Sequence, residues 1–315
     1  MAGMNAALSA AEQGLRVCLF EQRPWLGGHD DWRVSDFEGQ ALYQRARELA
    51  AAVEADDRIR VLTHAPVNGI WGDNLITGFQ VGNPGDYYTE RYYECRAITV
   101  VVASGCIERP LLCNNNDRPG VMQVNAAVRL AHTYGISPGR QAVFSVGDDL
   151  GLEGALDLHR LGIEVPVVAD ARIKGHNQQL VSGLEAAGIE FLPGWAASDV
   201  KGSKKVKAVT LGQRDGSSSR DFSCDLFAAS AGLQSVIGPL SSAKAKFRFC
   251  TDTGMFQPSC LPERIFAAGR MLAYANPGSI EASGRLAGLE AAAACGADVR
   301  AKLGTAQECL SSLPG

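Results

Sequence analysis

Residues 2–28 of the chain, AGMNAALSAAEQGLRVCLFEQRPWLGG, carry the pattern on which the fold prediction rests. Ala2 to Gly14 is typical of a helix of small residues closed by a glycine, and small residues let a helix lie close to a sheet. Arg16 to Phe20 follows as a short apolar strand, which ends in the acid Glu21 before the loop glycines Gly27 and Gly28. This order predicts the second half of a dinucleotide-binding βαβ unit, in which the strand-end acid binds ribose hydroxyl groups.

The phosphate-binding fingerprint that precedes such a helix is incomplete. The G-x-G-x-x-G motif needs a preceding apolar strand and two further glycines. The sequence begins at Met1, and only the last glycine of the motif, Gly3, is present. The domain is therefore expected to lack its first strand. An ordinary strand-ending glutamate after an amphipathic helix is the alternative interpretation of Glu21, and this stretch by itself leaves both open.

Later segments predict the remainder of the same domain. Three β-like runs, which together predict a β-meander, lie at Val67–Trp71, Leu75–Val81 and Tyr87–Cys95. Arg96 to Ala103 predicts a buried parallel strand that ends in Ser104 and Gly105, where small residues let a cofactor lie against the strand end.

The carboxyl-terminal part of the chain returns to this domain. Arg264 to Ala268 predicts a further strand, which ends in Gly269 and is followed by a helix of small residues over Ser283–Gly296. In two-domain oxidoreductases the amino terminus of this helix points toward the phosphates of the cofactor. Arg270 stands where an acid usually follows the glycine, so a hydrogen bond to a flavin's ribityl chain is lost.

A second βαβ pattern lies in the middle of the chain. Strands are predicted at Gln141–Val146 and Glu164–Ala169, with a helix at Leu152–Leu161 between them. The connecting turn, residues 147–154, reads GDDLGLEG and places Asp149 where the second fingerprint glycine belongs. Carboxylates at a helix amino terminus repel a pyrophosphate. The sequence therefore predicts that this second unit does not bind NAD(P)H.

Together these patterns predict an α/β protein with two Rossmann-like dinucleotide-binding domains, the second inserted in the first, and a β-meander. The first domain is expected over residues 1–115 and 245–315, and the inserted domain over residues 116–244. A length of 315 residues with 46% hydrophobic and 20% charged residues suits one large domain or two intertwined ones.

Composition excludes several classes of function. The net charge is −4 and no long basic run occurs, so neither nucleic acid nor an anionic membrane is expected as a partner. No window approaches the roughly 18 apolar residues of a membrane span, and no leader pattern is present, so a cytoplasmic protein is expected. Nine cysteines occur without C-x-x-C spacing, which argues against zinc, iron–sulfur or disulfide-redox sites.

Residues 103–122, ASGCIERPLLCNNNDRPGVM, resemble the A-T-G-x-x-E-R-P-L…N-D-R-P-G-V-M stretch of the alpha subunits of heterotetrameric sarcosine oxidases. The resemblance continues through RLAHTYGISPGRQAVF, ALDLHRLGIEVPVVADAR and CDLFAASAG, and the wider group includes the large subunits of related amine and opine oxidases. It implies one bound dinucleotide, NAD or FAD, and a beta-type partner subunit whose flavin oxidises a small amine or amino acid. FMN at the partner interface is a further cofactor that the resemblance allows.

The pattern and the resemblance together predict a set of cofactor-binding residues. These are Gly3, Glu21, Gln22, Arg23, Gly27, Gly28, Ala65, Ala103, Ser104, Gly105, Gly269 and Arg270. No catalytic residue and no metal ligand is assigned. The sequence lacks the first strand, the long carboxyl-terminal folate-binding domain and any iron–sulfur module of the family, so it is expected to be truncated at both ends.

Two hypotheses about function follow. The chain is either a flavoprotein-type oxidoreductase subunit that works in a hetero-oligomer with a flavin-bearing partner, or a truncated, non-catalytic remnant that serves as an assembly subunit. A self-sufficient NAD(P)H-dependent flavin reductase is disfavoured by the acidic second turn and by the lack of a redox cysteine pair.

Overall fold

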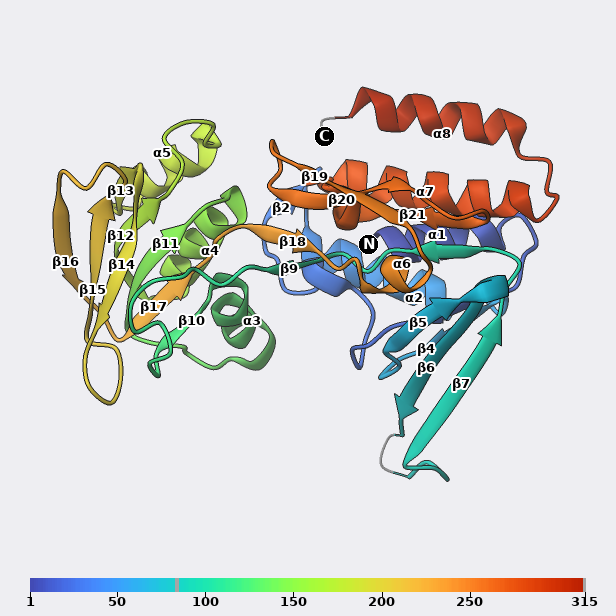
Figure 1. Ribbon diagram of the computed structural model, residues 1–315, viewed down its shortest axis with the longest axis horizontal. Coiled ribbons are helices and arrows are strands. Elements are labelled where there is room, and N and C mark those ends of the chain that lie inside the picture. The colour runs from blue at the N-terminus through green and yellow to red at the C-terminus, as the bar shows by residue number, and fades with distance from the viewer. Residues whose placement is uncertain (83–84, 314–315) are drawn as a thin grey trace. The chain divides into compact units, whose positions relative to one another are not determined.

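The computed structural model describes residues 1–82 and 85–313, and the chain forms two compact units (Figure 1). Unit 1 comprises Met1–Ile107 and Gln234–Gly315, and unit 2 comprises Glu108–Leu233. Unit 2 is thus inserted in unit 1, as the predicted fold class requires. The predicted domain boundaries, after residues 115 and 244, stay a prediction.

Unit 1 contains two pairs of short parallel strands. β1 (Val17–Phe20) pairs with β4 (Ile59–Leu62), and β8 (Val100–Val102) pairs with β21 (Ile265–Ala267). Helix α2 (Leu42–Glu54) forms the crossover between β1 and β4, as a parallel connection requires. The predicted strand over 96–103 is shorter in the structure, because Arg96 belongs to the preceding meander strand.

Two helices of small residues pack closely in unit 1. These are α1 (Ala2–Ala11) and α7 (Pro277–Ala294), which lie side by side in Figure 1. A Cβ atom added at Gly284 would lie 2.3 Å from the carbonyl oxygen of Ala2, and one at Gly288 would lie 2.4 Å from that of Ala6. Glycine at these two positions therefore sets the distance between the helices.

The remaining elements of unit 1 are an antiparallel meander, a hairpin and short connecting segments. The meander strands are β5 (Val67–Trp71), β6 (Leu75–Val81) and β7 (Glu90–Arg96). The hairpin is formed by β19 (Lys246–Cys250) and β20 (Met255–Cys260), and the other helices are α6 (Gly238–Ser242) and α8 (Arg300–Ser312). Short elements are η1 (Gly28–Asp30), β2 (Asp36–Phe37), β3 (Gln40–Ala41), η2 (Gly72–Asn74) and η3 (Gly269–Leu272). Strands β9 (Cys106–Glu108) and β18 (Leu233–Ser235) pair where the chain passes between the units.

Unit 2 is built on a five-stranded parallel sheet with strand order β10-β17-β11-β12-β13. The strands are β10 (Val121–Gln123), β11 (Gln141–Val146), β12 (Glu164–Asp170), β13 (Glu190–Pro193) and β17 (Leu226–Ala229). Its helices are α3 (Val124–Tyr134), α4 (Asp149–Arg160) and α5 (Gln178–Ala186). The apolar runs in β11 and β12 are buried, which is the pattern of a parallel sheet covered on both faces.

A second, antiparallel sheet packs against this one. It consists of β14 (Trp195–Lys201), β15 (Ala208–Gln213) and β16 (Ser219–Ser223). Buried side chains of both sheets form one core, including Val143, Val167, Val200, Leu211 and Phe227. Within residues 1–82 and 85–313, no helix is long and apolar enough to cross a membrane.

Candidate functional site

Glu21 lies where the sequence pattern predicts it, directly after β1. Its amide donates to the carbonyl of Leu62 at 2.9 Å, and its carbonyl accepts from the amide of Ala65 at 2.8 Å, so the parallel pairing continues past the strand end. The Glu21 carboxylate accepts from the amide of Arg23 at 2.8 Å. Burial raises the pKa of Glu21, and the Arg23 amide and charge oppose that rise. The structure thus brings Glu21, Arg23 and Ala65 together, while Gln22 faces solvent.

The loop after Glu21 is held by Arg23. The Arg23 guanidinium donates to the carbonyl of Gly28 at 2.6 Å and lies over the ring of Trp32 at 4.8 Å. Gly27 has a φ of 126°, and a Cβ there would approach the Cβ of Asp31 to 2.9 Å, so the turn needs glycine. The loop is therefore fixed in place beside the strand-end acid.

Small residues line the approach to the amino terminus of α1. A Cβ atom on Gly3 would lie 3.3 Å from the Cβ of Ala103, and one on Gly269 would lie 2.6 Å from the Cβ of Ala2. The first amides of a helix have no acceptor within the helix, which makes such a terminus a binding place for anions. The structure therefore places Gly3, Ala103 and Gly269 around the start of α1.

Ser104 and Gly105 follow β8 at the same end of the strands. The Ser104 hydroxyl donates to the carbonyl of Val236 at 2.7 Å, so it anchors the loop. Gly105 has a φ of 70°, and a Cβ there would meet no atom within 4 Å. Gly105 therefore faces open space, and its positive φ is the reason that glycine is favoured there.

Arg270 is buried and is bound by an acid that the sequence analysis did not single out. Its guanidinium donates to a carboxylate oxygen of Asp30 at 3.0 Å, and Arg33 donates to the same oxygen at 3.0 Å. Burial alone would raise the pKa of Asp30, but Arg270 and Arg33 outweigh it and hold that pKa well below its usual range. The pair joins the segment after β21 to the segment after the loop glycines. Arg270 therefore binds the segment that follows the loop glycines, through Asp30, in addition to standing where an acid usually follows Gly269.

His29 lies in the same segment as Asp30. Burial and the nearby Arg270 charge lower the pKa of His29 to about 3, so its ring is neutral at physiological pH. The buried Nε2 atom has no hydrogen-bond partner among the described residues. A polar group of a bound molecule would satisfy this atom.

These residues fit one dinucleotide. Glu21 supplies the strand-end carboxylate that suits ribose hydroxyl groups, and the start of α1 supplies amides that suit a pyrophosphate. Gly28 and Gly105 face open space, since a Cβ at either would meet no atom within 4 Å.

The amino terminus of α7 is less suited to phosphates than the sequence pattern predicts. The side chain of Asn276 already accepts from the amides of Gly278 and Ser279, at 2.8 and 3.4 Å.

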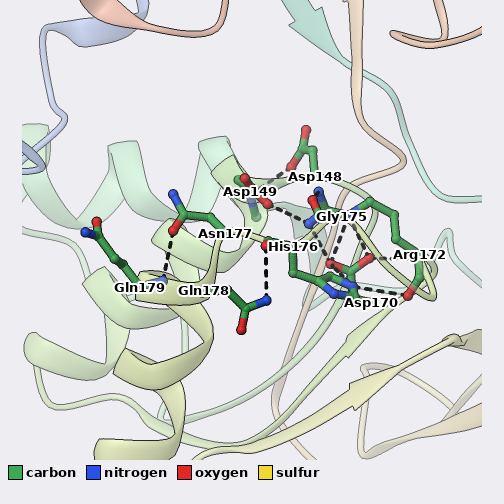
Figure 2. Close-up of polar contacts among 10 residues, drawn as sticks. Asp148, Asp149, Asp170, Arg172, Gly175, His176, Asn177, Gln178 and Gln179 are labelled. Carbon is green, nitrogen blue, oxygen red and sulfur yellow. Dashed lines mark hydrogen bonds and ion pairs between the residues drawn. The ribbon is translucent and has the colours of Figure 1, made fainter. Parts of the chain in front are cut away.

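Unit 2 carries a different cluster at the corresponding edge of its sheet. Figure 2 shows Asp148 and Asp149 at the start of α4, together with Asp170 at the end of β12 and Arg172 after it. The Asp148 carboxylate accepts from the amide of Gly151 at 2.8 Å and caps the helix. Arg172 contacts both Asp149 and Asp170. The sequence pattern predicts that this strand ends at Ala169, one residue before Asp170, and gives no signal for Arg172.

Glu108 is a half-buried acid that sequence reasoning did not single out. Its carboxylate accepts from the amide of Asn125 at 2.9 Å and so caps the start of α3 from another segment. Burial raises the pKa of Glu108 to about 7, against the effect of the Asn125 amide. The only signal in the sequence was its place in the E-R-P part of the family stretch.

All nine cysteines are free, and the described part of the chain holds no group of side chains suited to a metal ion.

Comparison with known proteins identifies relatives that align with most of this chain. Residues 1–285 match the family described as pyridine nucleotide-disulphide oxidoreductase. The sequence is 27% identical over 311 residues to sarcosine oxidase subunit alpha of Corynebacterium sp. (strain P-1), which covers 94% of this chain and 32% of that protein. The same subunit of Rhizobium meliloti (strain 1021) is 26% identical over 75% of this chain and 24% of its own length. The predicted resemblance is confirmed, and the chain spans about a third or less of these curated relatives.

Solved structures confirm the predicted fold class. L-proline dehydrogenase from P. horikoshii superimposes with a TM-score of 0.73 at 22% identity, covering 98% of this chain and 56% of that chain. Thioredoxin reductase of T. acidophilum gives a TM-score of 0.70 at 17% identity and covers 93% of both chains. At these identities the similarity concerns the fold.

Proposed function

Because the chain belongs to the pyridine nucleotide-disulphide oxidoreductase family, we propose that it is an oxidoreductase subunit that binds one dinucleotide, FAD or NAD, in unit 1. The family makes it a dinucleotide-binding oxidoreductase. The observation that carries our choice of site is the Glu21 carboxylate, which the continued β1–β4 pairing holds at the strand end. The predicted cofactor residues from Gly3 to Arg270 all belong to unit 1.

The proposed reaction is the oxidation of a secondary amine or amino acid together with a flavin-bearing, beta-type partner subunit. The similarity to the alpha subunits of two sarcosine oxidases supports a partner, and their alignments extend over most of this chain. FMN at the interface with that partner belongs to the same proposal. A tagged chain isolated from its native cells is expected to bring with it a second polypeptide from which denaturation releases flavin.

The first test is to identify the dinucleotide and to locate it. Purified protein is denatured, and released FAD or NAD is measured by absorbance and mass spectrometry; the emptied protein is then titrated with each. Glu21→Gln removes the charge that binds ribose hydroxyl groups and is expected to weaken binding about 10- to 100-fold, as befits a lost charge-assisted hydrogen bond.

Glu12→Gln is the matched control, because Glu12 is an exposed glutamate just after α1. It is expected to bind like the unchanged protein. Absence of any binding of FAD or NAD, or equal binding by the Glu21 and Glu12 variants, would contradict the proposed site.

A further inference from the structure

The carboxyl edge of the parallel sheet in unit 2 is the place where open α/β sheets bind ligands. In a pyridine nucleotide site of this type, amides at the start of the helix bind the pyrophosphate, and the acid at the end of the next strand binds ribose. Here the corresponding parts are the start of α4 and Asp170 at the end of β12. Both are in position, so the question is whether they are available to a nucleotide.

Arg172 engages the strand-end acid of this edge. Its Nε donates to Asp170 at 3.1 Å, its Nη2 donates to the second oxygen at 2.8 Å, and its amide donates to the first at 2.8 Å (Figure 2). Asp170 is fully buried. A carboxylate that already accepts these bonds within its own chain has little capacity left for ribose hydroxyl groups.

The same guanidinium reaches the start of α4. Nη2 of Arg172 donates to Asp149 at 2.7 Å. One side chain therefore bridges the start of α4 and the end of β12, the two parts that would bind a nucleotide. Bonds to Asp170 and Asp149 raise the pKa of Arg172 although burial by itself lowers it. His176 completes this side of the cluster, with its Nε2 3.7 Å from Asp170 and 3.2 Å from the carbonyl of Arg172.

The start of α4 is also unsuited to a pyrophosphate. Asp148 caps it through one oxygen, while the other oxygen is buried and has no hydrogen-bond partner among the residues that the structure describes. Burial raises the pKa of Asp148. With Asp149 and Asp170 this edge carries three acidic side chains, which disfavour a further anion.

The glycines of the turn serve packing. A Cβ on Gly151 would lie 2.6 Å from Val146, and one on Gly154 would lie 2.3 Å from Val124. Their small size is therefore explained by contacts with β11 and α3, without a phosphate.

We propose that this edge is an internally closed nucleotide site, in which Arg172 takes the place of a ligand between Asp149 and Asp170 and neither NADH nor NADPH binds. The sequence points to the acidic turn, and the structure adds the side chain that closes the site. The inference disagrees with the pyridine nucleotide that the family implies for unit 2. It does not depend on which dinucleotide occupies unit 1.

The test is hydrogen exchange of the full chain, read by mass spectrometry on peptides that cover residues 147–154 and 170–177. NADH or NADPH is added at about 1 mM, where a ligand with a Kd of about 10 µM is about 99% bound. Neither is expected to slow exchange in these peptides. Saturable protection there by either nucleotide would overturn the proposal. Protection confined to unit 1 peptides reports on the other site, so failures of the two proposals are distinguishable.

Arg172→Gln tests the bridge itself. It is expected to speed exchange in the same peptides about tenfold or more, because Asp149 and Asp170 then lose the guanidinium that bridges them. Arg160→Gln is the control, since the side chain of Arg160 is exposed at the other end of α4, where it pairs with the buried Asp157. If the Arg172 variant exchanges like the Arg160 variant, the bridge does not close the site. If the Arg172 variant does not fold, the nucleotide measurement on the unchanged chain still decides the proposal.

Discussion

At the scale of single residues, the ion pair between Arg270 and Asp30 is the feature that most clearly depends on the fold. Both side chains are buried, and Asp30 serves two guanidinium groups through one oxygen. Removing one partner of a buried pair leaves an uncompensated charge, which costs about 3–5 kcal/mol.

Asp30→Asn is therefore expected to lower the free energy of unfolding by about 3–5 kcal/mol. Glu190→Gln, which breaks the exposed pair with Arg220, is expected to cost less than about 1 kcal/mol. Urea unfolding followed by circular dichroism measures both. A similar small loss in the two variants would show that Asp30 is not needed to neutralise Arg33 and Arg270.

At the scale of elements, the contact between α1 and α7 depends on two glycines. Gly284→Ala and Gly288→Ala place a methyl group against the backbone of α1, and such overpacking typically costs about 1–3 kcal/mol. Gly304→Ala in α8 is the control, because its Cβ would meet no atom within 4 Å and alanine is favoured in helices by about 1 kcal/mol. The midpoint temperature of thermal unfolding is expected to fall for the first two variants and to rise for the control. A rise in all three would mean that α1 and α7 do not approach so closely.

The start of α7 shows how a local signal was missed. The helix begins at Pro277, six residues before the predicted start at Ser283. Asn276 caps it and proline occupies the first helical position, which are ordinary starting signals. Asn-Pro-Gly is also a common turn sequence, so the residues around Asn276 do not by themselves distinguish a helix start from a turn.

At the scale of the whole molecule, the buried Asp30 and the half-buried Glu108 give the stability opposite dependences on pH. The folded-state pKa of Asp30 lies below its unfolded value, so its contribution is present above about pH 4 and is lost as the pH falls further. The folded-state pKa of Glu108 is about 7, above an unfolded value of about 4.3, so stability is lost as the pH rises from about 4.3 to 7.

Glu108→Gln is expected to remove the second effect. The variant should gain stability relative to the unchanged protein as the pH rises through this range, by at most about 4 kcal/mol. Glu185→Gln, on the exposed face of α5, is expected to follow the unchanged protein. Urea titrations at pH 4.5 to 8, each about half a unit apart, would measure this. Parallel curves for the Glu108 variant and the unchanged protein would contradict the prediction.

The sequence by itself determined the α/β class, the order of helix, strand and terminal acid at Glu21, and the poor phosphate turn at residues 147–154. These follow from hydrophobic period, capping and glycine placement, which depend on neighbours along the chain. Tertiary structure alone decided which charges meet. Arg270 and Asp30 are 240 residues apart, and Arg172 bridges a strand end and a helix start. Such pairs form because parallel strands bring their carboxyl ends to one edge, a proximity that spacing in the sequence does not encode.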